Sequence, residues 1–289
     1  MTAPRAAMIL TLTCQDQVGI VAAVAGALAA IGGFILDSQQ YADLDTGRFF
    51  MRVVFTGASD GFPNEPAAVH DALAPVAAAF RFDWSLHSAS DRPRVLIAVS
   101  KGSHCLNDLL HRWQTGALPV EIVGVLSNHE NLRPLVQWHG LPWHHLPVTA
   151  DTRDAQEAAI VTLMAEARAD YLVLARYMQV LGPGLVAALE GRCINIHHSF
   201  LPGFKGARPY HRAHARGVKL IGATAHFVTG DLDEGPIIEQ AVERVDHRAS
   251  VDDLIRIGRD IESQVLARAV AWVGERRVFH NGNRTLVFR

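Results

Sequence analysis

The periodicity of the apolar segments in this chain changes once, near residue 90, and this change limits the folds that the chain can adopt. Before it, strand-length and helical patterns follow in the order strand, helix, strand, strand, helix, strand. After it, continuous apolar strands alternate with helical patterns. The first order predicts a ferredoxin-like βαββαβ unit, and the second predicts a Rossmann-like, mostly parallel sheet. We therefore predict an α/β protein of two domains.

The first predicted domain covers residues 1–86. Asp16 is the candidate N-cap of its first helix, and Gly32 and Gly33 are expected to end that helix. A hairpin turn is expected at 45–47. The predicted strands are 7–13, 34–41, 48–56 and 81–88, and the predicted helices are 20–31 and 65–80.

The second predicted domain covers residues 94–289, after a polar, proline-ended linker at 88–93. A closing hairpin is expected to pair 278–279 with 286–288 and to turn at Asn281 and Gly282. The predicted strands are 94–99, 120–126, 171–174, 224–229 and 237–245, and the predicted helices are 103–113, 131–139, 151–168 and 251–272.

Composition narrows the function classes. The formal net charge is −2 and no run of Lys and Arg stands out, which argues against a nucleic-acid partner. No apolar stretch reaches the roughly 18 residues of a membrane span, and the first residues do not resemble a signal peptide. Cys14, Cys105 and Cys193 lie far apart without a CxxC motif. This cysteine usage predicts a reducing compartment, the cytoplasm.

The segment that follows Asn195 is rich in His, Pro, Gly and Arg, which is typical of functional loops. Asn195 and His197 are two apart at a predicted strand end, so their side chains share a face and could hold a carbonyl oxygen. Asp231, Asp233 and Glu234 follow in a later loop, where a carboxylate could orient the imidazole or hold a water. A purely structural role for these residues also stays open. A metal site of His197, His198 and Asp233 is disfavoured, because adjacent residues on a strand point to opposite faces.

Four strings, 194–202, 206–209, 226–228 and 232–236, resemble the signature of the folate-dependent formyltransferase family. The resemblance implies that Asn195, His197 and Asp233 are catalytic and that His226 supports them. The segment 174–181 resembles the family's pterin-lining segment. Through it, the resemblance implies folate contacts for Leu174, Arg176, Tyr177, Met178, Val180 and Leu181.

The N-terminal unit resembles an ACT domain, and its combination with the second domain resembles the formyltetrahydrofolate deformylases over nearly the full chain. The resemblance implies hydrolysis of 10-formyltetrahydrofolate to formate and tetrahydrofolate, which supplies formate for purine biosynthesis and balances the folate pool. It implies no separate cofactor and no metal. It also implies a homo-oligomer and an amino-acid effector bound near Asp16, Gly19 and Ile20, although this unit could serve oligomerisation alone.

Two other functions stay open at this point. A formyltransferase would pass the formyl group to a small amine. The segment 100–106 lacks the second glycine and the Asn of the phosphate loop in glycinamide ribonucleotide formyltransferases, although Lys101, Arg208 and Arg212 could still hold a phosphate. A non-enzymatic one-carbon sensor would have a degenerate site, and the joint presence of Asn195, His197 and Asp233 argues against it.

Overall fold

The computed structural model describes residues 7–58, 61–63, 65–203 and 209–289, and the chain divides into two compact units. The first unit runs to Asp91 and includes Glu275–Phe279 and Phe288–Arg289, whereas the second is Arg92–Gly274 with His280–Val287. The sequence prediction places all of 94–289 in the second domain. Two short C-terminal segments pack with the first unit instead, because the Phe279 ring meets Phe50 edge-on at 6.0 Å and Phe288 at 5.3 Å.

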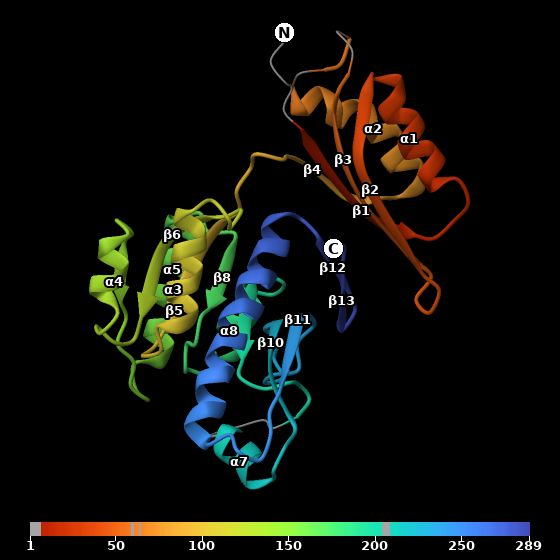
Figure 1. Ribbon diagram of the computed structural model, residues 1–289. Coiled ribbons are helices and arrows are strands. Elements are labelled where there is room, and N and C mark those ends of the chain that lie inside the picture. Colours follow the sequence, from red (N-terminus) through yellow and green to blue (C-terminus); the bar gives the residue numbers. More distant parts are fainter. Residues whose placement is uncertain (1–6, 59–60, 64, 204–208) are drawn as a thin grey trace. The chain divides into compact units, whose positions relative to one another are not determined.

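The first unit has the predicted βαββαβ order. Its four strands form an antiparallel sheet in the order β2-β3-β1-β4, with the helices packed on it (Figure 1). Leu10 and Leu12 of β1 share a core with Val24 and Leu28 of α1 and with Leu73 of α2. The elements are β1 (Met8–Gln15), α1 (Ile20–Ala30), β2 (Gly33–Asp43), β3 (Arg48–Gly57), α2 (Pro66–Phe80) and β4 (Asp83–Ser88).

Helix α1 starts later than an Asp16 cap would place it. Gly19 is the N-cap and has a φ of 98°, a left-handed conformation that glycine adopts without steric cost. Asp16 lies directly after β1, where its backbone N–H donates to the carbonyl of Gly47 at 2.8 Å. The predicted capping role of Asp16 is therefore wrong.

The second unit contains a seven-stranded sheet in the order β11-β10-β9-β8-β5-β6-β7. The five strands from β9 to β7 are parallel, as predicted, and β10 runs antiparallel to both β9 and β11. The strands are β5 (Arg94–Val99), β6 (Glu121–Ser127), β7 (Trp143–His145), β8 (Tyr171–Leu174), β9 (Cys193–His197), β10 (Leu220–Phe227) and β11 (Ile237–Arg244).

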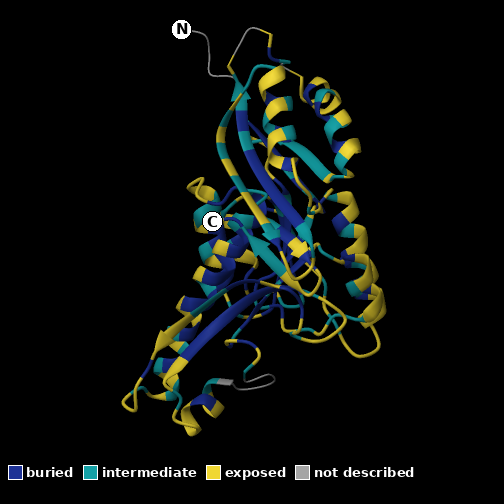
Figure 2. Cartoon of the chain, turned by 90° about the vertical axis from the view of Figure 1, so that its right-hand side faces the viewer, coloured by how far each residue is buried: buried dark blue, intermediate teal, exposed yellow. Residues whose placement is uncertain are grey.

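Helices cover both faces of this sheet. Leu96 and Ala98 of β5 share a core with Ile160 and Met164 of α5, while α8 packs against α3 and against strands β9 to β11. The exposed faces of the helices and the buried strands are visible in Figure 2. The helices are α3 (His104–Gln114), α4 (Arg133–Trp138), α5 (Arg153–Glu166), α6 (Pro183–Ala188), α7 (Pro209–Ala215) and α8 (Val251–Gly274).

Three elements were not predicted: β7, α6 and α7, which span only three to seven residues. Segments this short hold too few residues to show a period. The closing hairpin of β12 (Val278–Asn281) and β13 (Arg284–Val287) was predicted, but its turn lies one residue later. Asn281 belongs to β12, and Gly282, at a φ of 63°, begins the turn.

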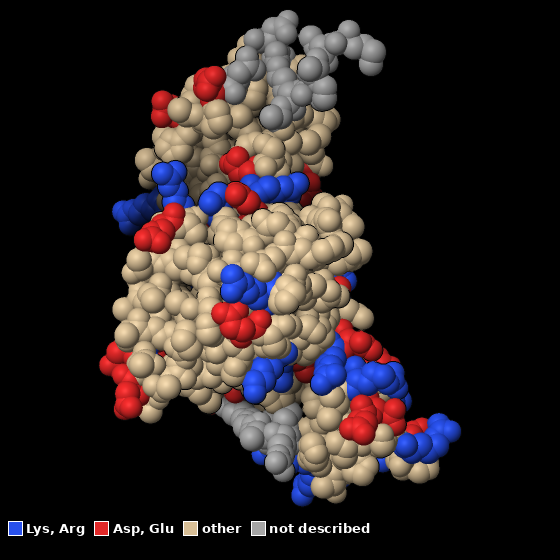
Figure 3. Space-filling view, turned by 90° about the vertical axis from the view of Figure 1, so that its left-hand side faces the viewer, with Lys and Arg blue, Asp and Glu red and all other residues tan. Residues whose placement is uncertain are grey.

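Charges of both signs lie side by side on the face shown in Figure 3. Ion pairs join some of the charged side chains of the second unit, and Arg94 pairs with Glu121 at 2.7 Å. Within the described part of the chain, no helix combines the length and the apolarity that crossing a bilayer requires.

Candidate active site

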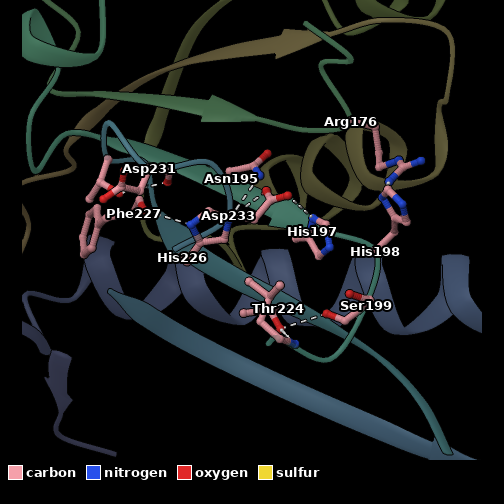
Figure 4. Close-up of polar contacts among 12 residues, drawn as sticks. Arg176, Asn195, His197, His198, Ser199, Thr224, His226, Phe227, Asp231 and Asp233 are labelled. Carbon is pink, nitrogen blue, oxygen red and sulfur yellow. Dashed lines mark hydrogen bonds and ion pairs between the residues drawn. The ribbon is translucent and has the colours of Figure 1, made fainter. Parts of the chain in front are cut away.

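The candidate catalytic residues meet where β9 ends beside β10. Asn195 and His197 lie on β9, and the antiparallel register places Asn195 opposite His226 and His197 opposite Thr224. Asp233 comes from the loop that connects β10 to β11 and reaches back over this strand end (Figure 4). The structure therefore brings together all four side chains that the sequence singled out.

The Asp233 loop returns tightly onto β10. Phe227 donates its backbone N–H to the carbonyl of Pro236 at 2.9 Å, and Asp233 has a φ of 58°. Aspartate tolerates this left-handed region better than most residues. A Cβ on Gly235 would lie 1.7 Å from the carbonyl oxygen of Phe227, so only glycine permits this return.

Replacing Gly235 by alanine is expected to push the loop outward and to move the Asp233 carboxylate away from His197. If Asp233 has the predicted catalytic role, its misplacement by about 1 Å should lower kcat by about 10²-fold, with a stability loss of about 1–3 kcal/mol. Steady-state kinetics and thermal unfolding measure both. The matched control is Gly230→Ala in the same loop, where an added Cβ meets nothing within 4 Å. Equal rates for the two variants would contradict this account of Gly235.

A hydrogen-bond chain determines how Asn195 is oriented. The Nδ1 of His226 lies 2.8 Å from the carbonyl oxygen of Phe227, which can only accept, so this nitrogen carries the proton. The Nε2 of His226 then accepts from the Nδ2 of Asn195 at 3.2 Å. Burial lowers the pKa of His226, which keeps the ring neutral. One amide hydrogen of Asn195 is thus held by His226, and no described residue takes the second, which can therefore donate to a ligand.

His197 and Asp233 form the second pair of the site. The Nδ1 of His197 lies 3.2 Å from the Oδ2 of Asp233, and both side chains are largely buried. The Nε2 of His197 is buried and has no hydrogen-bond partner among the described residues. Burial raises the pKa of Asp233, but the hydrogen bond and the charge of His197 outweigh it and hold that pKa below its ordinary value. Asp233 is therefore a carboxylate at neutral pH.

A cavity of about 320 Å³, here called the site cavity, opens beside these groups and is lined by Asn195, His197, His226 and Asp233. Its volume is within the range of small-molecule sites. All six residues for which the sequence predicts folate contacts line the same cavity: Leu174, Arg176, Tyr177, Met178, Val180 and Leu181.

The prediction that His197 and His198 point to opposite faces is wrong. Strand β9 ends at His197, so the alternation of a strand does not extend to His198. The two rings stack at 4.9 Å between centroids, with 23° between their planes. The Nδ1 of His198 accepts from the Nη1 of Arg176 at 2.6 Å. Burial, together with the charges of Arg176 and His197, lowers the pKa of His198 to about 4.

This shift predicts a pH dependence of stability. A histidine that has a pKa of about 4 when folded and its ordinary 6.5 when unfolded contributes stability above pH 6.5, and this contribution is lost as the pH falls toward 4. We expect about 2 kcal/mol from this effect after solvent screening. Urea unfolding of the wild type and of His198→Asn, followed from pH 7 to pH 4, measures it. As the pH falls over this range, the unfolding free energy of the wild type should decrease more than that of His198→Asn. An equal decrease in both proteins would contradict the lowered pKa of His198.

Sequence reasoning missed a buried carboxylate near the site. Glu262 of α8 is 1% exposed and accepts hydrogen bonds from the Nε2 of His104 at 2.9 Å and the Oη of Tyr210 at 2.7 Å. Its Oε2 also lies 3.3 Å from the Nε of Arg176. A signal was present in the sequence, because Glu262 falls within the apolar stripe of its helix, between Gly258 and Leu266.

Among the described residues, His104, Cys105 and Glu262 are the group with metal-ligand spacing, with ligand atoms within 4.8 Å of one another. Their chemistry fits a metal poorly. Burial raises the pKa of the Cys105 thiol, whereas a metal binds the thiolate. Both oxygens of Glu262 already accept hydrogen bonds from protein groups.

The remaining predicted residues lie elsewhere. The motif residues 206–208, with Arg208, fall outside the described part of the chain. In the first unit, the side chain of Ile20 is 2% exposed and packs in the core, so it offers a ligand only its backbone. Gly19 lies in the turn before α1, and Asp16 lies directly after β1 in the segment that leads to this turn.

The formyl transferase family matches this chain over residues 93–270. A formyltetrahydrofolate deformylase of Corynebacterium sp. (strain P-1) is 50% identical over 281 residues, which are 97% of this chain and 98% of the relative. A formyltetrahydrofolate deformylase structure from Burkholderia mallei has a TM-score of 0.93 and 52% identity, and the match covers 98% of this chain and 100% of that one.

A more distant match covers only about two thirds of this chain. The glycinamide ribonucleotide transformylase 1 structure from Symbiobacterium toebii has a TM-score of 0.63 and 30% identity, over 68% of this chain and 95% of that one. The deformylases match nearly the whole chain, including both units, whereas the transformylase does not. The chain belongs to the formyltetrahydrofolate deformylase family, and its larger unit has the formyl transferase fold.

Proposed function

We propose that this protein hydrolyses 10-formyltetrahydrofolate to formate and tetrahydrofolate. The observation that carries the proposal is the His197–Asp233 pair, which leaves the Nε2 of His197 buried and without a partner among the described residues, beside Asn195 in the site cavity. Such an arrangement suits a carbonyl group on which negative charge develops. The names of the full-length relatives support the same reaction.

In the proposed mechanism, the formyl oxygen lies between Asn195 and His197. The second amide hydrogen of Asn195 and an N–H at the Nε2 of His197 donate to it as it becomes an oxyanion. In this proposal His197 enters the step as an imidazolium, with one N–H shared with Asp233 and the other donated to the substrate, and its positive charge adds to the stabilisation.

Asp233 acts on the attacking water. Its carboxylate accepts a proton as the water oxygen bonds to the formyl carbon, and the resulting tetrahedral intermediate is held by Asn195 and His197. The bond from carbon to the folate nitrogen then breaks, and that nitrogen receives the proton gathered by Asp233. Formic acid leaves and ionises to formate. Substrate and water supply all the atoms, so the proposal includes no separate cofactor and no metal.

The segment that follows β8 would hold the folate. Tyr177 is buried, whereas Met178 and Val180 are more than half exposed at the cavity, which suits an apolar ring system. The segment is attached to the sheet by Ser100, whose backbone N–H donates to the carbonyl of Arg176 at 3.2 Å and whose Oγ accepts from the backbone N–H of Met178 at 3.0 Å.

The test is to incubate the purified full-length protein with 10-formyltetrahydrofolate and to measure formate and tetrahydrofolate without any amine. Equimolar release of both is the expected result. Release only when an amine is added would favour a formyltransferase, the second candidate, which is supported by the fold shared with the transformylase of Symbiobacterium toebii. Tight folate binding without turnover would favour a one-carbon sensor and would overturn the proposal.

The finer parts of the proposal concern regulation and setting. We propose that the first unit is an ACT domain that binds an amino acid near Asp16, Gly19 and Ile20, and that the chain forms a homo-oligomer. Strand β2 supports pairing with another copy, because it is an 11-residue edge strand. Calorimetric titration with glycine and with methionine tests the effector, and silence from every amino acid would leave oligomerisation as the role of this unit.

We further propose that the protein works in the cytoplasm and that its formate serves purine biosynthesis. Cys14, Cys105 and Cys193 are all free and buried, which suits a reducing compartment. Localisation of a tagged chain, and purine dependence of a deletion strain, test these two statements.

A further inference from the structure

A second cavity adjoins the site cavity, and the two share part of their lining. It has a volume of about 580 Å³ and is here called the cationic cavity, because its lining includes Lys101, His104, His129, His211 and Arg259. Glu262 is the acidic residue of this lining, and its oxygens are occupied by protein donors. The two cavities share four lining residues, which are Arg176, Met178, Gln179 and His198.

Arg176 and His198 are the titratable residues of this shared wall, and each of them also contacts a further side chain. The guanidinium of Arg176 contacts Glu262 through its Nε at 3.3 Å and donates from its Nη1 to His198 at 2.6 Å. His198 in turn stacks on His197. Figure 4 shows Arg176 directly beside His198, on the side of His197 away from Asn195.

The backbone at Arg176 is itself unusual. Its φ is 67°, a left-handed conformation that is unfavourable for a residue with a long side chain. Strained positions of this kind persist where the surrounding structure holds them and tend to occur at functional sites. Here the conformation directs a large cationic side chain between two cavities.

The wall has a chemical consequence. Arg176 and His198 lie in the lining that the two cavities share, so an amine held in the cationic cavity meets them before it reaches the site cavity. We propose that Arg176 and His198, held together by Glu262, form a partition that excludes amine acceptors from the formyl carbon and leaves water as the nucleophile. This inference rests on the proposed deformylase function and concerns its choice of nucleophile.

The two competing reactions differ only in the attacking atom. In hydrolysis, the water oxygen bonds to the formyl carbon, the bond to the folate nitrogen breaks, and a proton from water passes to that nitrogen. In transfer, an amine nitrogen forms the new bond, the same bond breaks, and the proton comes from the amine. Specificity of this kind is set by an element that obstructs the wrong partner.

The experiment measures how the formyl group is divided between water and an amine. Each protein is incubated with 10-formyltetrahydrofolate labelled with ¹³C in the formyl group and with O-phosphoethanolamine, a primary amine with a phosphate suited to the cationic cavity. Ethanolamine is the comparison that lacks the phosphate. Nuclear magnetic resonance distinguishes ¹³C-formate from the ¹³C-formylated amine.

The first variant is Arg176→Gly, because glycine adopts a φ of 67° without strain and opens the wall. We expect the wild type to place its label in formate. The variant should raise the ratio of formylated amine to formate by about tenfold or more, a typical discrimination for one steric feature. The rise should be larger with O-phosphoethanolamine than with ethanolamine. The matched control is Arg168→Gly, an exposed arginine that also has a left-handed φ, of 47°, at the end of α5.

Two further variants keep the test decisive if Arg176→Gly does not fold. His198→Ala removes the other half of the partition and should also raise the ratio. Glu262→Gln tests the positioning role of Glu262, since a merely structural defect would lower total turnover without changing the ratio. An unchanged ratio in the folded variants, with the wild type still releasing formate, would overturn the partition alone. A wild type that releases no formate without an amine would instead overturn the deformylase function and, with it, this inference.

Discussion

Asp233→Asn is expected to lower kcat by about 10²–10⁴-fold, the range that loss of a general base typically costs. Asparagine keeps the size of the side chain but cannot take a proton from water. It also presents an amide in place of the carboxylate oxygen that lies 3.2 Å from the Nδ1 of His197. Circular dichroism and the Tm should remain close to those of the wild type, and substrate binding should persist.

The loop offers a matched comparison for this variant. Asp231→Asn removes an exposed carboxylate two residues away that has no described contact with His197, and it is expected to change kcat by less than about threefold. If Asp233→Asn retains wild-type turnover, or if the two variants lose it equally, Asp233 is not the base.

His197→Ala is expected to lower kcat by about 10²–10³-fold, the usual cost of losing one donor to a developing oxyanion. The loss should fall mainly on kcat, because the donor acts on charge that is present only in the transition state. His197→Gln retains an amide N–H donor without the positive charge of the imidazolium. A rate for His197→Gln between those of His197→Ala and the wild type would separate hydrogen bonding from charge. A kcat near that of the wild type for His197→Ala would contradict the proposed role.

Much of the fold was predictable because it depends on local pattern. The βαββαβ order of the first unit, and the parallel strands of the second, follow from apolar periodicity and turn residues that lie within a few residues of one another. The exceptions have local reasons as well. Helix α6 has only six residues, and the capping position of α1 is taken by Gly19 through its backbone conformation.

The candidate site was predictable in part. The spacing of Asn195 and His197 determines that they share a face, but three carboxylates follow in the later loop. Residue chemistry alone does not choose among them, and the family resemblance selects Asp233. The folded backbone gives the physical reason, because the tight return at Gly235 and the left-handed φ of Asp233 bring that side chain to His197. The stacking of His198 on His197 depended on where β9 ends, which the sequence pattern left open.

The sequence by itself determined the two-unit α/β architecture and the residue types of the site, since periodicity and motif spacing are properties of neighbouring residues. The tertiary structure alone decided which distant groups meet. Glu262 lies on α8, whereas Arg176 follows β8 and His198 follows β9. The contacts among these three residues arise only when the sheet and α8 pack together. The same holds for Phe279 and Phe288, which belong to the first unit although they come from the far end of the chain. Burial and hydrogen bonding act between atoms that are close in space. A local sequence pattern does not predict which residues that are distant in the sequence come close together in the fold.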